Sequence, residues 1–140
     1  MPDRVFFDTN LWVYLHLHSE DTEDIRKKKI VARLLKKHPD IVISAQVLNE
    51  LANVFINKYH LPAGVVKERL EETGRIVEVK PLTEQVTFKA LKLLEDYNLS
   101  FFDALVVSSA IEAGCSIVFT EDMQAGQSIS GKTKIVNPFR

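Results

Sequence analysis

The sequence lacks the features that mark several classes of protein. It has one cysteine, Cys115, so it cannot form a disulfide within the chain, and no spacing of Cys and His resembles a zinc site. The first residues contain no long apolar stretch like that of a signal peptide, and no segment approaches the ~20 apolar residues that a membrane span requires. We therefore expect a cytoplasmic protein in a reducing compartment, with no membrane partner.

The chain also has no large excess of charge of either sign. Eighteen Lys and Arg residues stand against nineteen Asp and Glu, and the net charge of −1 indicates no bulk affinity for nucleic acid. The 140 residues, 46% of them apolar, suit one domain with a single core. We expect that domain to span residues 1–140.

Short β-rich runs alternate with longer helical patterns, which is typical of a parallel sheet covered by helices. The pattern predicts strands near residues 4–8, 41–44, 76–80, 116–120 and 134–136. It predicts helices near residues 10–17, 22–37, 46–59, 63–73, 84–97 and 102–113. The fold class is therefore α/β, a three-layer α/β/α arrangement with a central, mainly parallel sheet of four to five strands. The Gly- and Ser-containing segment 124–132 is predicted to be a mobile loop.

Four carboxylates follow apolar segments that should be buried, or lie just inside the helix after one: Asp8, Glu50, Asp103 and Asp122. Functional groups of an open α/β sheet gather at the carboxyl ends of its strands, so residues distant in sequence can meet in one acidic pocket. Crowded carboxylates repel each other unless a cation or a proton offsets their charge. Since Mg²⁺ and Mn²⁺ prefer oxygen ligands, the four acids predict a divalent metal site.

Each acid also has a structural interpretation. Asp8 could only cap the helix that follows it, and Asp103, three residues after Ser100, fits a capping box. Glu50 could be an exposed helix residue, and Asp122 could form a turn. Capping does not explain why acids of three separate units should fall at the same end of one sheet, so the four together favour the metal site.

Polar side chains accompany the acids at two strand ends. Asn10, two residues after Asp8, projects a neutral amide that can orient a water or a phosphate oxygen. Thr9 and Thr120 supply hydroxyl groups, for which hydrogen bonding within a local turn is an equal alternative. A divalent ion at such a site lowers the pKa of a bound water and stabilises charge during in-line displacement at phosphorus. The residues therefore suit phosphodiester hydrolysis.

The motifs that carry these residues resemble, in order and spacing, those of PIN-domain ribonucleases. They are Phe6-Phe7-Asp8-Thr9-Asn10, Val47-Leu48-Asn49-Glu50-Leu51, Phe102-Asp103-Ala104-Leu105-Val106-Val107 and Thr120-Glu121-Asp122. The resemblance covers nearly the whole chain and implies a PIN-like fold. It also implies that the metal and catalytic residues are Asp8, Glu50, Asp103 and Asp122, supported by Asn10 and Thr120. Glu121 lies beside Asp122, and strand alternation allows only one of the two to point inward.

The small size is similar to that of the VapC toxins of prokaryotic toxin–antitoxin pairs. The resemblance thus implies an endoribonuclease that uses Mg²⁺ or Mn²⁺ to cleave RNA, a cognate antitoxin and a homodimer. Apolar residues beyond what one sheet face can cover also favour a partner surface on the helices of residues 46–73: Leu48, Phe55, Ile56, Leu61, Val65 and Leu70.

Two other functions remain as alternatives. A phosphoacceptor signalling domain also alternates strands and helices, but the third strand ends at Val79-Lys80-Pro81 with no aspartate to accept phosphate. A non-catalytic PIN-like binding module would be expected to lack one of the four acids, and all are present. The basic run Arg26-Lys27-Lys28-Lys29 is interpreted as a solvated helix face, and the four histidines lie beside no motif.

Overall fold

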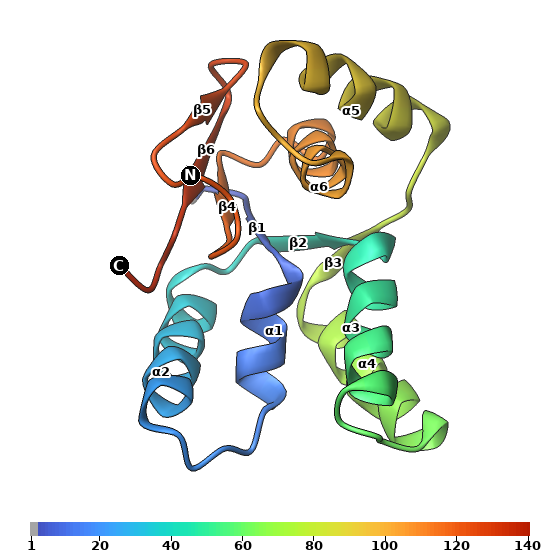
Figure 1. The fold of residues 1–140 in the computed structure, drawn as a ribbon, viewed down its shortest axis with the longest axis vertical. Coiled ribbons are helices and arrows are strands. Elements are labelled where there is room, and N and C mark those ends of the chain that lie inside the picture. The colour runs from blue at the N-terminus through green and yellow to red at the C-terminus, as the bar shows by residue number, and fades with distance from the viewer. Residues whose placement is uncertain (1–2) are drawn as a thin grey trace.

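The computed structural model describes residues 3–140, in which six strands form one sheet in the order β3-β2-β1-β4-β6-β5 (Figure 1). The strands are β1 (Val5–Phe7), β2 (Ile41–Ser44), β3 (Glu78–Lys80), β4 (Ile117–Phe119), β5 (Ser128–Ile129) and β6 (Thr133–Val136). All neighbours are parallel except β5, which pairs antiparallel with β6. The sheet has one strand more than the upper limit of the prediction.

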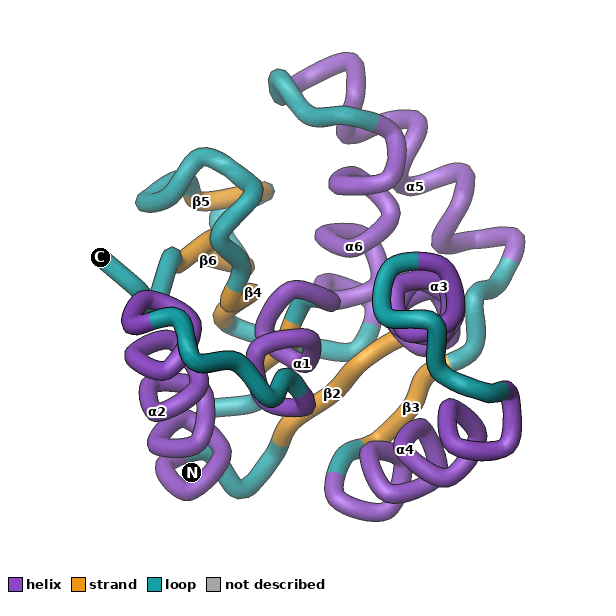
Figure 2. The backbone as a smooth tube through the Cα atoms, turned by 60° about the horizontal axis from the view of Figure 1, so that its bottom comes forward, coloured by secondary structure: helices purple, strands orange, loops and turns teal. Residues whose placement is uncertain are grey.

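Six helices cover this sheet within the described residues. They are α1 (Thr9–His16), α2 (Thr22–Lys37), α3 (Ala45–Asn57), α4 (Ala63–Ile76), α5 (Glu84–Asp96) and α6 (Phe101–Glu112). Helices α1 to α4 lie on one side of the sheet and α5 and α6 on the other (Figures 1 and 2). The predicted three-layer α/β/α class is confirmed.

One helix boundary differs from the prediction by more than two residues. Helix α4 continues through Gly74 to Ile76, so β3 begins at Glu78, later than expected. A glycine inside a helix costs only about 1 kcal/mol relative to alanine, so Gly74 does not have to end the helix. Buried Thr73 anchors this last turn, because its hydroxyl donates to the carbonyl of Arg69 and contacts His16.

The central strands form the core, since every residue of β1 and β2 is buried. Strands buried on both faces are expected where helices cover a parallel sheet on both sides. Trp12 of α1 is also buried, and its indole Nε1 donates to the carbonyl of Phe7 at 3.2 Å. Trp12 is therefore a core residue.

The segment predicted to be a mobile loop, residues 124–132, contains β5. Its Ile129 is fully buried, and the backbone N–H of Ser130 donates to the Tyr97 hydroxyl at 2.8 Å. Gly131 has a φ of 64°, which a glycine adopts without strain at this turn into β6. A strand of two residues is too short to leave an alternating pattern, so the sequence did not predict it.

This topology brings three chain segments to one edge of the sheet. Asp8 follows β1, α3 begins directly after β2, and Thr120 follows β4. The backbone N–H of Asp8 donates to the carbonyl of Phe119 at 3.0 Å, which fixes the ends of β1 and β4 side by side. Within residues 3–140, none of the helices has both the length and the apolar character needed to cross a membrane.

Candidate metal centre

Asp8 is the most buried carboxylate of the candidate site, with 5% of its surface exposed. Its Oδ1 accepts a hydrogen bond from the backbone N–H of Thr9 at 2.7 Å, and its Oδ2 accepts one from the Thr120 hydroxyl at 2.8 Å. Burial raises the pKa of Asp8 to about 6, and the charges of Glu50 and Asp122 add to the rise. Asp8 therefore caps α1 and is also a member of an acidic cluster.

Glu50 projects from α3 toward the start of α1. The Thr9 hydroxyl donates to its Oε2 at 2.8 Å, and the Gln46 amide donates to its Oε1 at 2.6 Å. Glu50 is half-buried, so the structural interpretation as an exposed helix residue is wrong. Gln46 was not among the predicted site residues, although its position one turn before Glu50 on the same helix indicates that it can orient the carboxylate.

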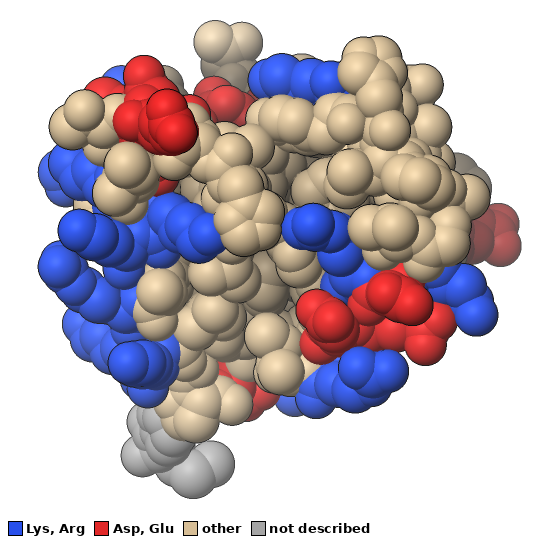
Figure 3. Space-filling model, turned by 90° about the horizontal axis from the view of Figure 1, so that it is seen from below, with Lys and Arg blue, Asp and Glu red and all other residues tan. Residues whose placement is uncertain are grey.

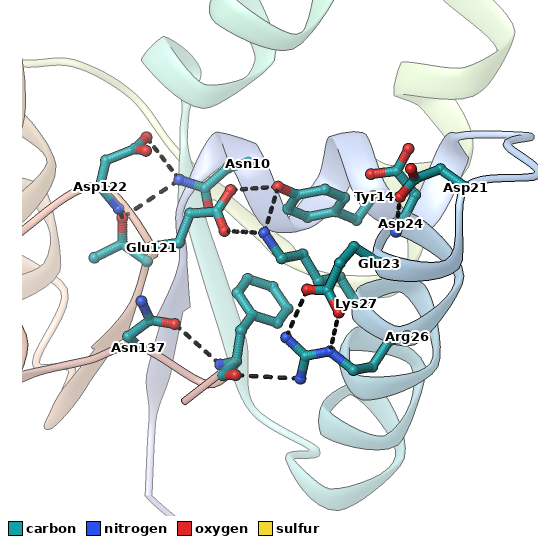
Figure 4. Close-up of polar contacts among 12 residues, drawn as sticks. Asn10, Tyr14, Asp21, Glu23, Asp24, Arg26, Lys27, Glu121, Asp122 and Asn137 are labelled. Carbon is teal, nitrogen blue, oxygen red and sulfur yellow. Dashed lines mark hydrogen bonds and ion pairs between the residues drawn. The ribbon is translucent and has the colours of Figure 1, made fainter.

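Asp122 is held by contacts with Asn10 and Thr120, and Figure 4 shows its carboxylate beside the Asn10 amide. The Asn10 amide donates to Asp122 Oδ2 at 2.7 Å, with a longer contact of 3.5 Å to the Thr120 hydroxyl oxygen. That same oxygen accepts the backbone N–H of Asp122 at 3.2 Å. Thr120 thus connects Asp8 to Asp122 through one hydroxyl group.

Asp103 is in the first turn of α6 and is half-buried. The cap of this helix comes from Ser100, whose hydroxyl oxygen accepts the backbone N–H of Asp103 at 3.1 Å. Burial raises the pKa of the Asp103 carboxyl, and the charges of Asp122 and Glu50 act in the same direction. Asp103 therefore interacts with the other acids through electrostatic repulsion. The other three acids are connected by hydrogen bonds through Thr9, Thr120 and Asn10.

Glu121 points away from these four acids. Its carboxylate accepts a hydrogen bond from the Tyr14 hydroxyl and forms an ion pair with Lys27, whose Nζ lies 2.9 Å away (Figure 4). Asp122 is thus the member of the pair that joins the site. Among the described residues, no histidine donates to or accepts from the four acids.

The acids are not gathered closely enough to hold an ion as they stand, since no three Asp, Glu, His or Cys side chains within residues 3–140 form such a group. Like charges repel, and neutral donors hold the carboxylates of Asp8, Glu50 and Asp122 in their present places. The chemistry of the cluster nevertheless fits a divalent cation. All its ligands are oxygens, and the buried amide oxygens of Asn10 and Gln46 accept no hydrogen bond. A cation with its bound waters supplies the positive charge and the donors that these oxygens need.

A groove of about 550 Å³ opens beside the cluster. It runs between α1, α3 and the segment after β4, and both Glu50 and Asp122 line it. Lys58 and Tyr59 also line it, and neither was predicted from the sequence, because no motif surrounds them. The groove leads to two of the acids, Glu50 and Asp122.

Comparison with known proteins supports the fold and the motifs. A family model described as PIN domain matches residues 5–126. Similar solved structures include the toxin VapC20 of Mycobacterium tuberculosis, described as cleaving the sarcin–ricin loop, at 21% identity and a TM-score of 0.66, covering 84% of this chain and 89% of that one. Among curated proteins, none matches this sequence significantly.

Two further structures contain toxin–antitoxin assemblies. A toxin–antitoxin complex from Klebsiella pneumoniae is 19% identical, with a TM-score of 0.70, and the match covers 96% of this chain and 97% of that one. The VapBC2 complex from Rickettsia felis, bound to a DNA fragment from its promoter, is 19% identical with a TM-score of 0.62 over 95% of this chain and 98% of that one.

Proposed function

Because the chain belongs to the PIN-domain family, we propose that it is a Mg²⁺- or Mn²⁺-dependent endoribonuclease and the toxin of a toxin–antitoxin pair. The observation that carries the proposal is the bonding around buried Asp8. Thr120 and Asn10 connect Asp8 to Asp122, and the neighbouring Thr9 binds Glu50. The similarity of the fold to a toxin that cleaves RNA supports the choice of substrate.

In this proposal four carboxylates would hold the ion: Asp8, Glu50, Asp103 and Asp122. Such an ion would supply a lowered pKa for a bound water and positive charge to offset the negative charge that develops at phosphorus and on the leaving oxygen. Thr120 and the Thr9 backbone fix both oxygens of Asp8, so the most buried carboxylate has one orientation.

The supporting side chains have distinct tasks. Thr9 and Gln46 fix both oxygens of Glu50, and Asn10 fixes one oxygen of Asp122. The amide oxygen of Asn10 is buried without a hydrogen-bond donor, so in this proposal it accepts from a water held beside the ion. The carboxylates would still have to move closer together to hold an ion, and these contacts fix the positions from which Glu50 and Asp122 start.

A labelled single-stranded or looped RNA tests the activity directly. We expect cleavage with Mg²⁺ or Mn²⁺, none with EDTA and little with Ca²⁺. Asp8→Asn should abolish cleavage, whereas the matched control Asp96→Asn, which removes a charge from the exposed end of α5, should leave it unchanged. Equal cleavage in EDTA would contradict the proposal.

The proposed partners are an antitoxin and a second copy of the chain. Several similar structures are toxin–antitoxin complexes, two of them bound to DNA, which supports an antitoxin that binds DNA. A small neighbouring reading frame for such a protein is the expected source. Its co-expression should relieve growth arrest caused by the toxin and should inhibit RNA cleavage by the purified protein.

The phosphoacceptor alternative loses its support. Strand β3 ends at Lys80, ahead of Pro81, and no carboxylate follows it to receive phosphate. Glu50 and Asp103 would also have no task in such a domain. A non-catalytic module remains the alternative that the RNA assay excludes, because it would bind RNA without cleaving it.

A further inference from the structure

Glu121 and Asp122 are adjacent in sequence and line the same groove, yet their side chains take opposite directions (Figure 4). Asp122 binds Asn10 at the acidic cluster, and Glu121 binds Tyr14 and Lys27 on α1 and α2. The regular alternation of a strand does not enforce this choice, since β4 has ended at Phe119. Side-chain contacts must therefore select which carboxylate faces the site.

Lys27 makes the contacts that hold Glu121. Its Nζ lies 2.9 Å from Glu121 Oε2 and 3.2 Å from the Tyr14 hydroxyl oxygen, and it also lies over the rings of Tyr14 and Phe139, at 4.9 and 5.4 Å from their centroids. The carbonyl of Phe139 accepts a hydrogen bond from Arg26 at 3.2 Å, which ties the end of the chain to α2. Lys27 is thus enclosed by two aromatic rings and a carboxylate.

The pair differs from the other charges of α2. The side chains of Lys27 and Glu121 are each 21% exposed. Most of the remaining basic residues of the helix are exposed: Arg26, Lys29, Arg33, Lys36 and Lys37. Many Lys and Arg side chains gather on the left of the face seen in Figure 3. A partly buried ion pair with an additional phenol donor keeps its geometry better than an exposed pair.

We propose that Lys27 and Tyr14 are positioning residues that hold Glu121 out of the metal site, so that Asp122 is the carboxylate this segment presents to the ion. The inference rests on the proposed metal site. Glu121 has a long flexible side chain next to four acids that attract a cation. Without a counter-charge, it would remain in the groove as a competing ligand. Lys27 removes that competition by neutralising Glu121 and fixing its direction.

Mn²⁺ binding tests this inference without reference to cleavage. Free Mn²⁺ can be measured by electron paramagnetic resonance during titration of the wild type, Lys27→Met, Glu121→Gln and the double variant. The control Lys29→Met removes a charge from the same helix, where Lys29 is exposed and makes no ion pair within residues 3–140. Thermal melts establish that each variant is folded before titration.

We expect Lys27→Met to bind Mn²⁺ at least about threefold more tightly, because a freed carboxylate adds charge to the site and affinity follows the number of charged ligands. Its RNA cleavage should fall by about tenfold or more, since the ion is drawn toward Glu121. Replacing Glu121 by Gln in the Lys27→Met background should restore wild-type values of both. Glu121→Gln alone and Lys29→Met should bind Mn²⁺ as the wild type does.

Three results would overturn the inference: wild-type Mn²⁺ affinity in Lys27→Met, no restoration in the double variant, or weakened binding in Glu121→Gln, which would make Glu121 itself a ligand. These outcomes are separate from the failure of the proposed function. A protein that binds Mn²⁺ at the four acids but cleaves no RNA would refute the ribonuclease, and the comparison of Mn²⁺ affinities would still decide the role of Lys27.

Discussion

At the scale of the residue, Asp8 shows how one carboxylate can satisfy two demands. It accepts the backbone N–H of Thr9 as a helix cap would, and it also lies within a cluster of like charges. The two roles require different properties of the carboxylate. A helix cap requires only that one of its oxygens accept a hydrogen bond, whereas a metal ligand must stay ionised. Burial makes that charge costly in the absence of a cation.

The first prediction concerns the pH dependence of the metal-free protein. The pKa of Asp8 is about 6 in the folded state against an ordinary value of 3.8, so the folded state binds its proton more tightly than the unfolded state. The free energy of unfolding should therefore fall by about 2 kcal/mol between pH 4 and pH 6.5, out of about 3 kcal/mol over the whole titration, with little further change from this residue above pH 7. Urea denaturation at a series of pH values, with EDTA present, measures this free energy of unfolding.

Asp8→Asn is the control for this prediction, because it removes the titrating group. The difference in unfolding free energy between variant and wild type should grow in favour of the variant over the same pH range. Mg²⁺ added at pH 7.5 should stabilise the wild type and not the variant. A difference that stays constant from pH 4 to pH 7 would contradict the raised pKa of Asp8.

The second prediction separates the metal ligand from the cap at Asp103. The cap bond uses the backbone N–H of Asp103 and the side chain of Ser100, so Asp103→Asn leaves it intact. The metal-free variant should be as stable as the wild type or more stable, because one repelling charge is gone. Cleavage should fall by about a hundredfold or more, which corresponds to at least ~2.7 kcal/mol of transition-state stabilisation.

Single-turnover cleavage rates, with thermal melts in the presence and absence of Mg²⁺, make this measurement. A destabilised variant that cleaves at the wild-type rate would mean that Asp103 is structural. The candidate site would then consist of Asp8, Glu50 and Asp122.

At the scale of the element, the starts of helices decide where the functional groups lie. Helix α1 begins at Thr9 directly after β1, and α3 begins at Ala45 directly after β2. Short connections leave little freedom in the direction of each first turn, so the polar residues there project toward the same edge of the sheet. Helix α6 is different, because in the sequence it follows helix α5 and not a strand. Its first turn is capped by the Ser100 side chain.

The third prediction tests that cap. Ser100→Ala removes the acceptor for the backbone N–H of Asp103 and should lower the free energy of unfolding by about 1 kcal/mol or slightly less. Cleavage should change by no more than about threefold, because tertiary packing of α6 still places Asp103 in the site. Chemical denaturation and cleavage rates on the same preparation measure both. Unchanged stability would show that the cap contributes nothing to the fold.

At the scale of the whole molecule, the apolar surface is distributed differently from the prediction. Of the residues expected to favour association on α3 and α4, Phe55 is buried in the core, and Ile56 and Val65 are exposed. Ile76 at the end of α4 is 60% exposed, and on the other side of the sheet Phe88 and Leu91, one turn apart on α5, are 60% and 46% exposed. Exposed apolar patches usually mark interaction surfaces, so α5 is the stronger candidate for self-association.

The fourth prediction follows from that surface. Light scattering should give twice the chain mass of 15.9 kDa for the wild type at micromolar concentration. Phe88→Asp with Leu91→Asp should give the monomer mass, whereas the control Ile25→Asp, which alters an exposed apolar residue of α2, should not. A monomeric wild type at high micromolar concentration would remove the dimer and leave the nuclease proposal unaffected.

Much of this protein was determined by the sequence itself. The alternation of strand and helix patterns predicted the three layers of the fold, because an element buried on one face has apolar residues at a regular spacing in the sequence. The apolar runs before Asp8 and Asp122 gave the strand ends, and with them the edge where acids gather. Chain segments with a strong local signal were predicted well, whereas the two-residue strand β5 and the extension of α4 to Ile76 were not.

Only the tertiary structure decided which partner each side chain takes. The role of Gln46, the opposite directions of Glu121 and Asp122, and the enclosure of Lys27 depend on contacts between α1, α2, α3 and the segment after β4. A local pattern reports whether a residue is buried or polar, but not which distant residue lies 3 Å from it. That distance is set by how the helices pack on the sheet, and sequence neighbours such as Glu121 and Asp122 carry no local record of it.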